Sequence, residues 1–270
     1  MFLTKGDFCL HNDVCGDLMS SEKNALNDGI RNALKIMKDA GFEISDKLTV
    51  SVDPKLPFMG YSTKKDGKDV IVISGEALKS GMIEGLLVHE MSHIYRITTN
   101  HPSHNSRLLN KVGYSIIRKR HLTRDYQIKL IQQAVNHVQD LYADDITFKV
   151  FSHSNLFPPN QAFAFFLSWI NDQPSRSKGA KTVWLNIGIL LDNCFALSNI
   201  VRHNIPDPNH EAENKAQSFL SQTSKEISDT FAYIEAFMTN LKENVTEKEF
   251  AESLTNYLTR IVDLAEKSIE

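Results

Sequence analysis

A His-Glu-x-x-His pattern lies inside a stretch whose apolar residues have helical spacing. The stretch runs from about Glu76 to Ile97, and its apolar residues recur at every third or fourth position. His89 and His93 are four residues apart, so both imidazoles lie on one face of such a helix, with Glu90 beside them. Because apolar residues enclose the pattern, the chain must pack this helix against a core and still hold its two histidines together.

This pattern is typical of a catalytic zinc site. Two imidazoles on one helix face can bind one zinc ion, while the glutamate acts on a water bound to that ion. We predict that His89 and His93 are zinc ligands and that Glu90 is the catalytic general base, which takes a proton from the zinc-bound water. The predicted cofactor is therefore Zn²⁺, and the predicted chemistry is hydrolysis.

A catalytic zinc ion generally takes three protein ligands, and we expect the third on a second helix. The stretch from Arg124 to Val150 contains no glycine or proline, and His137, Asp140 and Asp144 share one face of it. One of the carboxylates of this region, Asp140, Asp144 or Asp145, could complete the zinc site. Asp144 and His137 would flank the site, where a carboxylate can accept the second ring N–H of a ligating histidine.

Histidines that directly follow the first helix are weaker candidates. A third histidine six residues after His93 would be another familiar ligand, but that position is Thr99. His101 and His104 lie in the loop-like segment His-Pro-Ser-His-Asn, which we interpret as solvated.

The order of strand, His-Glu-x-x-His helix and acidic helix resembles the gluzincin metallopeptidases, in particular the HtpX and CAAX prenyl endopeptidase group. In that group the third ligand is the glutamate of Glu-x-x-x-Asp, and the segment from Asp140 to Asp144 is similar. The resemblance therefore implies Asp140 as the third ligand. Its side chain is one methylene shorter than the family's glutamate, so Asp144 and Asp145 stay as alternatives. Val72–Leu78 and Glu84–Glu90 are similar to the family's strand and active-site helix. The resemblance covers about 70–151, and the family's transmembrane segments are missing, so we expect a soluble relative.

The resemblance implies a zinc-dependent metallopeptidase that hydrolyses peptide bonds. Its peptide or protein substrate would lie along an edge strand beside the cleft, here Val70–Ile73. The reaction also needs a hydrogen-bond donor for the oxyanion. The candidate donors are His203, Tyr142, His153, Arg202 and His210.

The expected fold is mainly α with a small β-sheet, in which a zincin-like catalytic core is joined to a helical C-terminal part. We place the boundary at Pro158-Pro159, so that the core is 1–157 and the helical region, ending in a helical hairpin, is 158–270. The expected elements are a helix from Ser20 to Gly41, adjacent strands at Leu48–Val52 and Val70–Ile73, helices at Gln161–Ile170 and Lys181–His203, one helix carrying Leu220 to Leu241, and another that begins at Thr246.

Composition narrows the partners and the location. The 30 basic residues are balanced by 33 acidic ones, so we expect no nucleic-acid partner. Cys9, Cys15 and Cys194 include no CxxC pair, and no export signal is visible, which together favour a cytoplasmic protein. The most apolar window, Trp184–Val201, contains several polar residues, so we interpret it as a buried helix and predict no stable membrane insertion.

Two other functions are compatible with the same residues. A catalytically silent binding or regulatory protein could keep the fold and dock a partner protein on its C-terminal helices. Alternatively, a zinc hydrolase could act on a non-peptide amide or ester, because the motif specifies the metal and the water rather than the acyl substrate.

Overall fold

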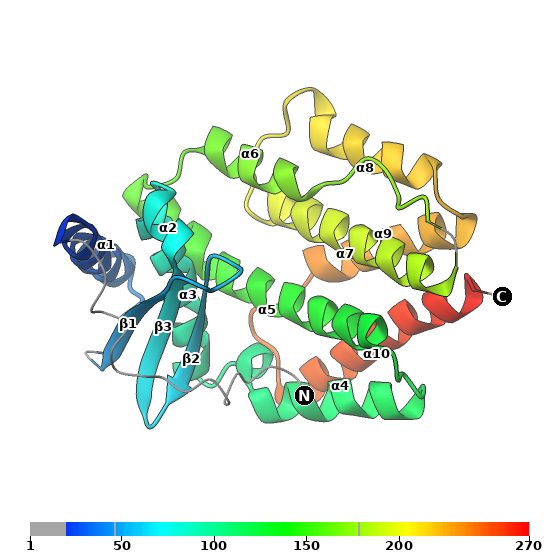
Figure 1. Ribbon diagram of the computed structural model, residues 1–270, viewed down its shortest axis with the longest axis horizontal. Coiled ribbons are helices and arrows are strands. Elements are labelled where there is room, and N and C mark those ends of the chain that lie inside the picture. The colour runs from blue at the N-terminus through cyan, green and yellow to red at the C-terminus, as the bar shows by residue number, and fades with distance from the viewer. Residues whose placement is uncertain (1–19, 46, 178, 270) are drawn as a thin grey trace. The chain divides into compact units, whose positions relative to one another are not determined.

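The computed structural model describes residues 20–45, 47–177 and 179–269, most of which are helical (Figure 1). One three-stranded sheet accompanies the helices, so the predicted class, mainly α with a small β-sheet, is confirmed. Cys9, Cys15 and the N-terminal residues on which the export prediction depends lie outside the described residues. The elements are α1 (Ser20–Asp39), β1 (Leu48–Asp53), β2 (Gly60–Lys65), β3 (Lys68–Ser74), α2 (Gly75–Lys79), α3 (Ile83–Thr98), η2 (Pro102–His104), α4 (Ser106–Lys119), α5 (Asp125–Ser154), α6 (Pro159–Trp169), α7 (Ala180–Arg202), η3 (Pro208–His210), α8 (Glu211–Ser221), α9 (Lys225–Thr239) and α10 (Glu247–Lys267).

The chain divides into two compact units, and the division passes through α5. Of the described residues, those up to His104 and Ala143–Phe157 form the first unit, which contains the sheet. Asn105–Tyr142 and the residues from Pro158 onward form the second, helical unit. The first unit is therefore smaller than the predicted core 1–157, because α4 packs against the C-terminal helix α10.

The sheet has the strand order β1-β3-β2, with β3 parallel to β1 and antiparallel to β2. The predicted strands correspond to β1 and β3, but the expectation that Val70–Ile73 forms an edge is wrong. All four of those residues are buried, as expected for a central strand with apolar side chains on both faces. The missed strand, β2, forms an edge of the described sheet, and its polar sequence Gly-Tyr-Ser-Thr-Lys-Lys is suited to that position.

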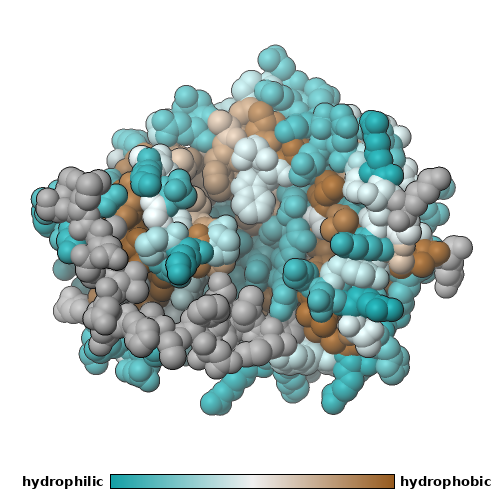
Figure 2. Space-filling model, viewed as in Figure 1, coloured by the Kyte–Doolittle hydropathy of each residue, from teal (hydrophilic) through white to brown (hydrophobic). Residues whose placement is uncertain are grey.

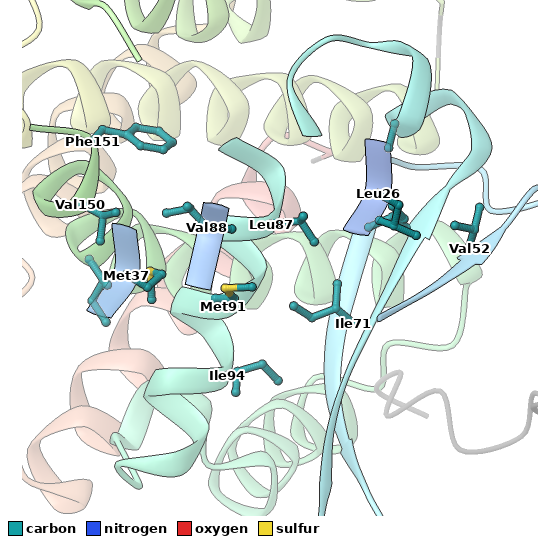
Figure 3. Packing of buried hydrophobic residues seen from close by; sticks show 14 residues of the cluster. Leu26, Met37, Val52, Ile71, Leu87, Val88, Met91, Ile94, Val150 and Phe151 are labelled. Atoms are coloured by element: carbon teal, nitrogen blue, oxygen red, sulfur yellow. The ribbon is translucent and has the colours of Figure 1, made fainter. Parts of the chain in front are cut away.

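The apolar core of the first unit is built around α3. Leu87, Val88, Met91 and Ile94 of this helix are almost completely buried. Figure 3 shows them among side chains of the sheet, of α1 and of the last turns of α5. The opposite side of α3 is thereby left to the polar residues of the His-Glu-x-x-His pattern.

The predicted helix from Glu76 to Ile97 is divided in two. Ser74 caps α2 with its side chain, and Gly81 has a φ of 68°, a left-handed conformation that glycine adopts without strain. The chain then re-enters a helix at Ile83. This break gives α3 a direction of its own, independent of the strand that precedes it.

In the helical unit, α7 is the most buried of the long helices described. It is long and apolar enough to cross a membrane, and 72% of its apolar window is buried inside the structure. Cys194, on this helix, is a buried free thiol. The interpretation of Trp184–Val201 as a buried helix is confirmed.

The expected helix from Leu220 to Leu241 is instead two helices, α8 and α9, because the chain leaves the helix between Ser221 and Lys225. The last helix, α10, begins at Thr246, whose capping box with Glu249 is formed. Phe237 stacks on Tyr257, while Arg260 lies over the ring of Tyr233. The order of these contacts shows that α9 and α10 run antiparallel, as a hairpin does.

Large apolar side chains that remain exposed are scattered over many elements of the described chain. Hydrophilic residues cover most of the face drawn in Figure 2. Among the exposed large apolar residues, Phe58 and Met59 are neighbours in the sequence, and they directly precede the edge strand β2.

Candidate metal centre

Helix α3 brings the Nε2 atoms of His89 and His93 face to face. The two nitrogens are 3.1 Å apart, and the rings lie nearly perpendicular to each other. Two imidazole nitrogens bound to one tetrahedral zinc ion are expected about 3.3 Å apart. The histidines are half-buried, and the His89 side chain keeps 27% of its surface exposed.

The other ring nitrogen of His89 is held by a buried carboxylate. Asp144 lies on α5, and its Oδ1 atom is 3.0 Å from His89 Nδ1. The two helices also meet where the Thr147 hydroxyl lies 3.1 Å from the Ser92 hydroxyl. A carboxylate can only accept, so His89 Nδ1 carries the proton and Nε2 keeps its lone pair. Because the two ring nitrogens point in different directions, Asp144 lies on the side of the His89 ring away from Nε2.

The other ring nitrogen of His93 is held by a second histidine. His104 is buried in the turn η2, and its Nε2 atom is 2.7 Å from His93 Nδ1. The pKa of His104 is held well below its usual value, first by burial and then by the positive potential of neighbours that include His93 and Arg96. His104 is therefore neutral near pH 7 and can accept the proton of His93 Nδ1.

The interpretation of the segment after α3 as solvated is wrong for His104. Asn100 has a φ of 55°, and the N–H of His101 bonds to the carbonyl of Arg96, so the chain turns back over the end of α3. An asparagine just after a helix is a recognised signal for such a left-handed turn. That signal could have indicated the return, although not which side chain would meet His93.

Asp140 lies one turn before Asp144 on α5, which continues without a break from Asp125 to Ser154. Asp140 belongs to the second unit, whereas His89, His93 and Asp144 belong to the first, so its role as the third ligand stays a prediction. The remaining alternative, Asp145, directly follows Asp144 and so projects about 100° away from it around the helix axis.

The donor set fits a divalent cation better than it fits any internal hydrogen bond. Asp144 and His104 take up the protons on the Nδ1 atoms, which leaves two lone pairs on the Nε2 atoms facing each other. Two such lone pairs repel, and a cation between them converts the repulsion into coordination. Two imidazoles with one carboxylate are a ligand set of catalytic zinc.

Glu90 is buried, and the edge strand passes close to its carboxylate. Only 5% of the surface of Glu90 is exposed. A Cβ atom added to Gly60 of β2 would lie 3.5 Å from Glu90 Oε1 and 3.1 Å from the carbonyl oxygen of Val72. The absence of a side chain at Gly60 therefore lets the edge strand approach the Glu90 carboxylate.

The other residues predicted for the site are engaged elsewhere. His137 was expected to flank the metal, but its Nε2 atom bonds to Asp192 at 2.9 Å and its ring stacks on Phe195 within the helical unit. Of the expected oxyanion donors, Tyr142 donates its hydroxyl to the carbonyl of Lys242. His153 is exposed near the end of α5, nine residues beyond Asp144.

The three candidates from the late part of the chain are likewise committed within the helical unit. His203 pairs with the Asn199 side chain at 3.1 Å, and the Arg202 guanidinium donates to the carbonyls of Met238, Thr239 and Leu241. His210 pairs with Glu213 at 2.9 Å. Of the three, Arg202 has a clear structural role, because it joins the end of α7 to the carbonyls at the end of α9.

The chain matches the model of a protein family whose function is unknown. Residues 23–262 match a family described as a family of unknown function (DUF5781). No curated protein and no solved structure matches the chain. The match spans both helices that carry the candidate metal centre.

Proposed function

Because the chain belongs to DUF5781, a family of unknown function, we propose its activity from the chemistry of the α3 site: it is a zinc-dependent metallopeptidase. The observation that supports this is the pair of Nε2 atoms, 3.1 Å apart, whose rings are each fixed from behind. His89 is fixed by Asp144 and His93 by His104. Both rings therefore present lone pairs to one point before any metal arrives.

In the proposed reaction, some residues of the site would bind the metal and Glu90 would transfer the proton. His89, His93 and Asp140 would hold Zn²⁺, which would supply Lewis acidity toward a water and toward the substrate carbonyl. Glu90 takes the proton of the attacking water and delivers it to the leaving amine. Its burial keeps the carboxylate in place and limits the bulk water that competes for it.

The edge strand β2 is the proposed docking site for an extended substrate. Ser74 N–H donates to Met59 C=O, so in the antiparallel alternation Tyr61 and Thr63 also bond to β3. The backbone groups of Gly60 and Ser62 then face the outer edge, where a peptide strand can pair with them. This replaces Val70–Ile73, which lies in the middle of the sheet.

A first test of the proposal is metal content together with hydrolysis. Purified full-length protein should hold about one zinc ion per chain and cleave members of a peptide library. A chelator should abolish cleavage, and added Zn²⁺ should restore it. Protein without stoichiometric zinc would contradict the proposal. If the protein binds zinc but cleaves no peptide, a catalytically silent binding protein or a hydrolase of non-peptide substrates would be the better explanation.

Replacing Gly60 with alanine should lower kcat/KM by about tenfold without changing zinc content. The new Cβ atom would be 3.1 Å from the Val72 carbonyl oxygen, so β2 must move by a few tenths of an ångström beside Glu90. Steady-state kinetics on a cleaved peptide measure the effect.

Thr63→Val is the matched control, because it alters the same strand at a position whose backbone bonds to β3. Equal kcat/KM values for Gly60→Ala and the wild type would show that the substrate does not use this edge. The cytoplasmic location and partner docking on the C-terminal helices stay predictions.

A further inference from the structure

Four side chains form a continuous hydrogen-bonded relay behind the second histidine of α3. His93 Nδ1 is 2.7 Å from His104 Nε2, and His104 Nδ1 is 2.8 Å from Ser103 Oγ. Ser103 Oγ is in turn 2.7 Å from His101 Nδ1. Ser103 and His104 are both buried, so the relay is shielded from exchange with bulk water.

The relay has a defined direction because a backbone group sets one end. The backbone N–H of Ser103 donates to His101 Nδ1 at 3.3 Å, so this nitrogen carries no proton. The Ser103 hydroxyl must then donate to the same nitrogen and accept from His104 Nδ1. His104 Nε2 is consequently without a proton and accepts from His93 Nδ1.

We propose that His104 is a positioning residue that fixes the tautomer and ring orientation of His93 through this relay. The proposal rests on the proposed zinc function, in which His93 Nε2 must offer a lone pair. His89 is positioned by the carboxylate of Asp144, whereas His93 is positioned by an uncharged imidazole. Both rings are thus held by a hydrogen bond to Nδ1, and only one of the two acceptors is a carboxylate.

The test is metal binding by full-length His104 variants. His104→Leu removes the acceptor, and we expect zinc affinity, measured by competition with a chelating dye, to fall about 10- to 100-fold. The visible absorption of the Co²⁺-loaded protein should change, because His93 is free to rotate. His104→Gln places an amide oxygen where Nε2 lies and should restore affinity to within about threefold of the wild type.

His137→Leu is the matched control, since His137 is also buried and hydrogen-bonded but lies in the helical unit. It should leave zinc affinity and the Co²⁺ spectrum unchanged. Ser103→Ala interrupts the relay without altering a histidine and should weaken zinc binding by a smaller factor than His104→Leu. If His104→Leu does not fold, Ser103→Ala tests the relay in its place.

Two results would overturn the inference. Wild-type affinity and an unchanged spectrum in both His104→Leu and Ser103→Ala would exclude a role for the relay while leaving the zinc site intact. An affinity of His104→Gln as low as that of His104→Leu would show that volume, not the hydrogen bond, matters at this position. Wild-type protein that binds neither metal would overturn the proposed function itself, so the two failures are distinguishable.

Discussion

Glu90→Gln should reduce kcat/KM for peptide hydrolysis by about 10²- to 10⁴-fold, the usual contribution of a positioned general base. Glutamine has nearly the same shape as glutamate, so the packing around this buried side chain is preserved. Its amide cannot take a proton from water near neutral pH, which removes the proposed proton transfer in both directions. Steady-state kinetics with a peptide cleaved by the wild type measure the loss.

The variant should keep its zinc, because Glu90 is not among the proposed zinc ligands. Elemental analysis of the same preparation separates loss of the base from loss of the metal. Glu84→Gln is the matched control, since Glu84 lies on the same helix and its carboxylate bonds to Asn32. Activity of Glu90→Gln equal to that of this control would remove the general base from the mechanism.

The carboxylates of α5 should differ sharply in their effect on zinc binding. Asp140→Asn removes a proposed ligand, and we expect zinc affinity to fall by at least about 100-fold, more than loss of a partner of a ligand costs. Asp144→Asn keeps an oxygen that accepts from His89 Nδ1 but loses the charge, so a fall of about tenfold is expected. Competition with a chelating dye measures both affinities.

Asp145→Asn is the control for this series, because it makes the same chemical change on the adjacent position of the same helix. Its zinc affinity should equal that of the wild type. If Asp145→Asn lost zinc and Asp140→Asn retained it, the ligand assignment would be wrong by the register of the helix. Equal losses in Asp140→Asn and Asp144→Asn would indicate that both carboxylates reach the ion.

The parts of the site that depend on one helix could be predicted from the sequence. The spacing of His89, Glu90 and His93 places them on one side of α3, and the apolar residues between them occupy the core side. The same reasoning predicted that α5 carries Asp140 and Asp144 one turn apart. These inferences succeed because helical periodicity acts over a few residues and needs no knowledge of the rest of the chain.

The sheet could be predicted only in part from the hydrophobic pattern of the sequence. Continuous apolar residues in Val70–Ile73 correctly indicated a strand, but such a run is typical of a strand buried on both faces rather than of an edge. The edge strand β2 carries no apolar alternation, so its residues give no strand signal. Exposed edge strands commonly carry polar or charged residues, which discourage pairing with another chain.

The hydrogen bonds that His137 and most of the expected oxyanion donors make could not be predicted for a related reason. Histidine, tyrosine and arginine can serve an active site or satisfy buried backbone and side-chain groups, and their identity does not distinguish these uses. Arg202 caps the carbonyls at the end of α9, and Tyr142 bonds to a backbone carbonyl. Only the positions of these acceptors, which come from other helices, decide which use applies.

By itself, the sequence determined the fold class and the helix on which His89, Glu90 and His93 lie together. The tertiary structure alone decided which distant groups meet that helix. His104 reaches His93 through the turn at Asn100, Asp144 reaches His89 because α5 packs on α3, and β2 rather than β3 presents the free edge near Glu90. Each of these contacts depends on where the chain reverses direction and on which surfaces pack together. Residue spacing along one helix or strand carries no information about these two features.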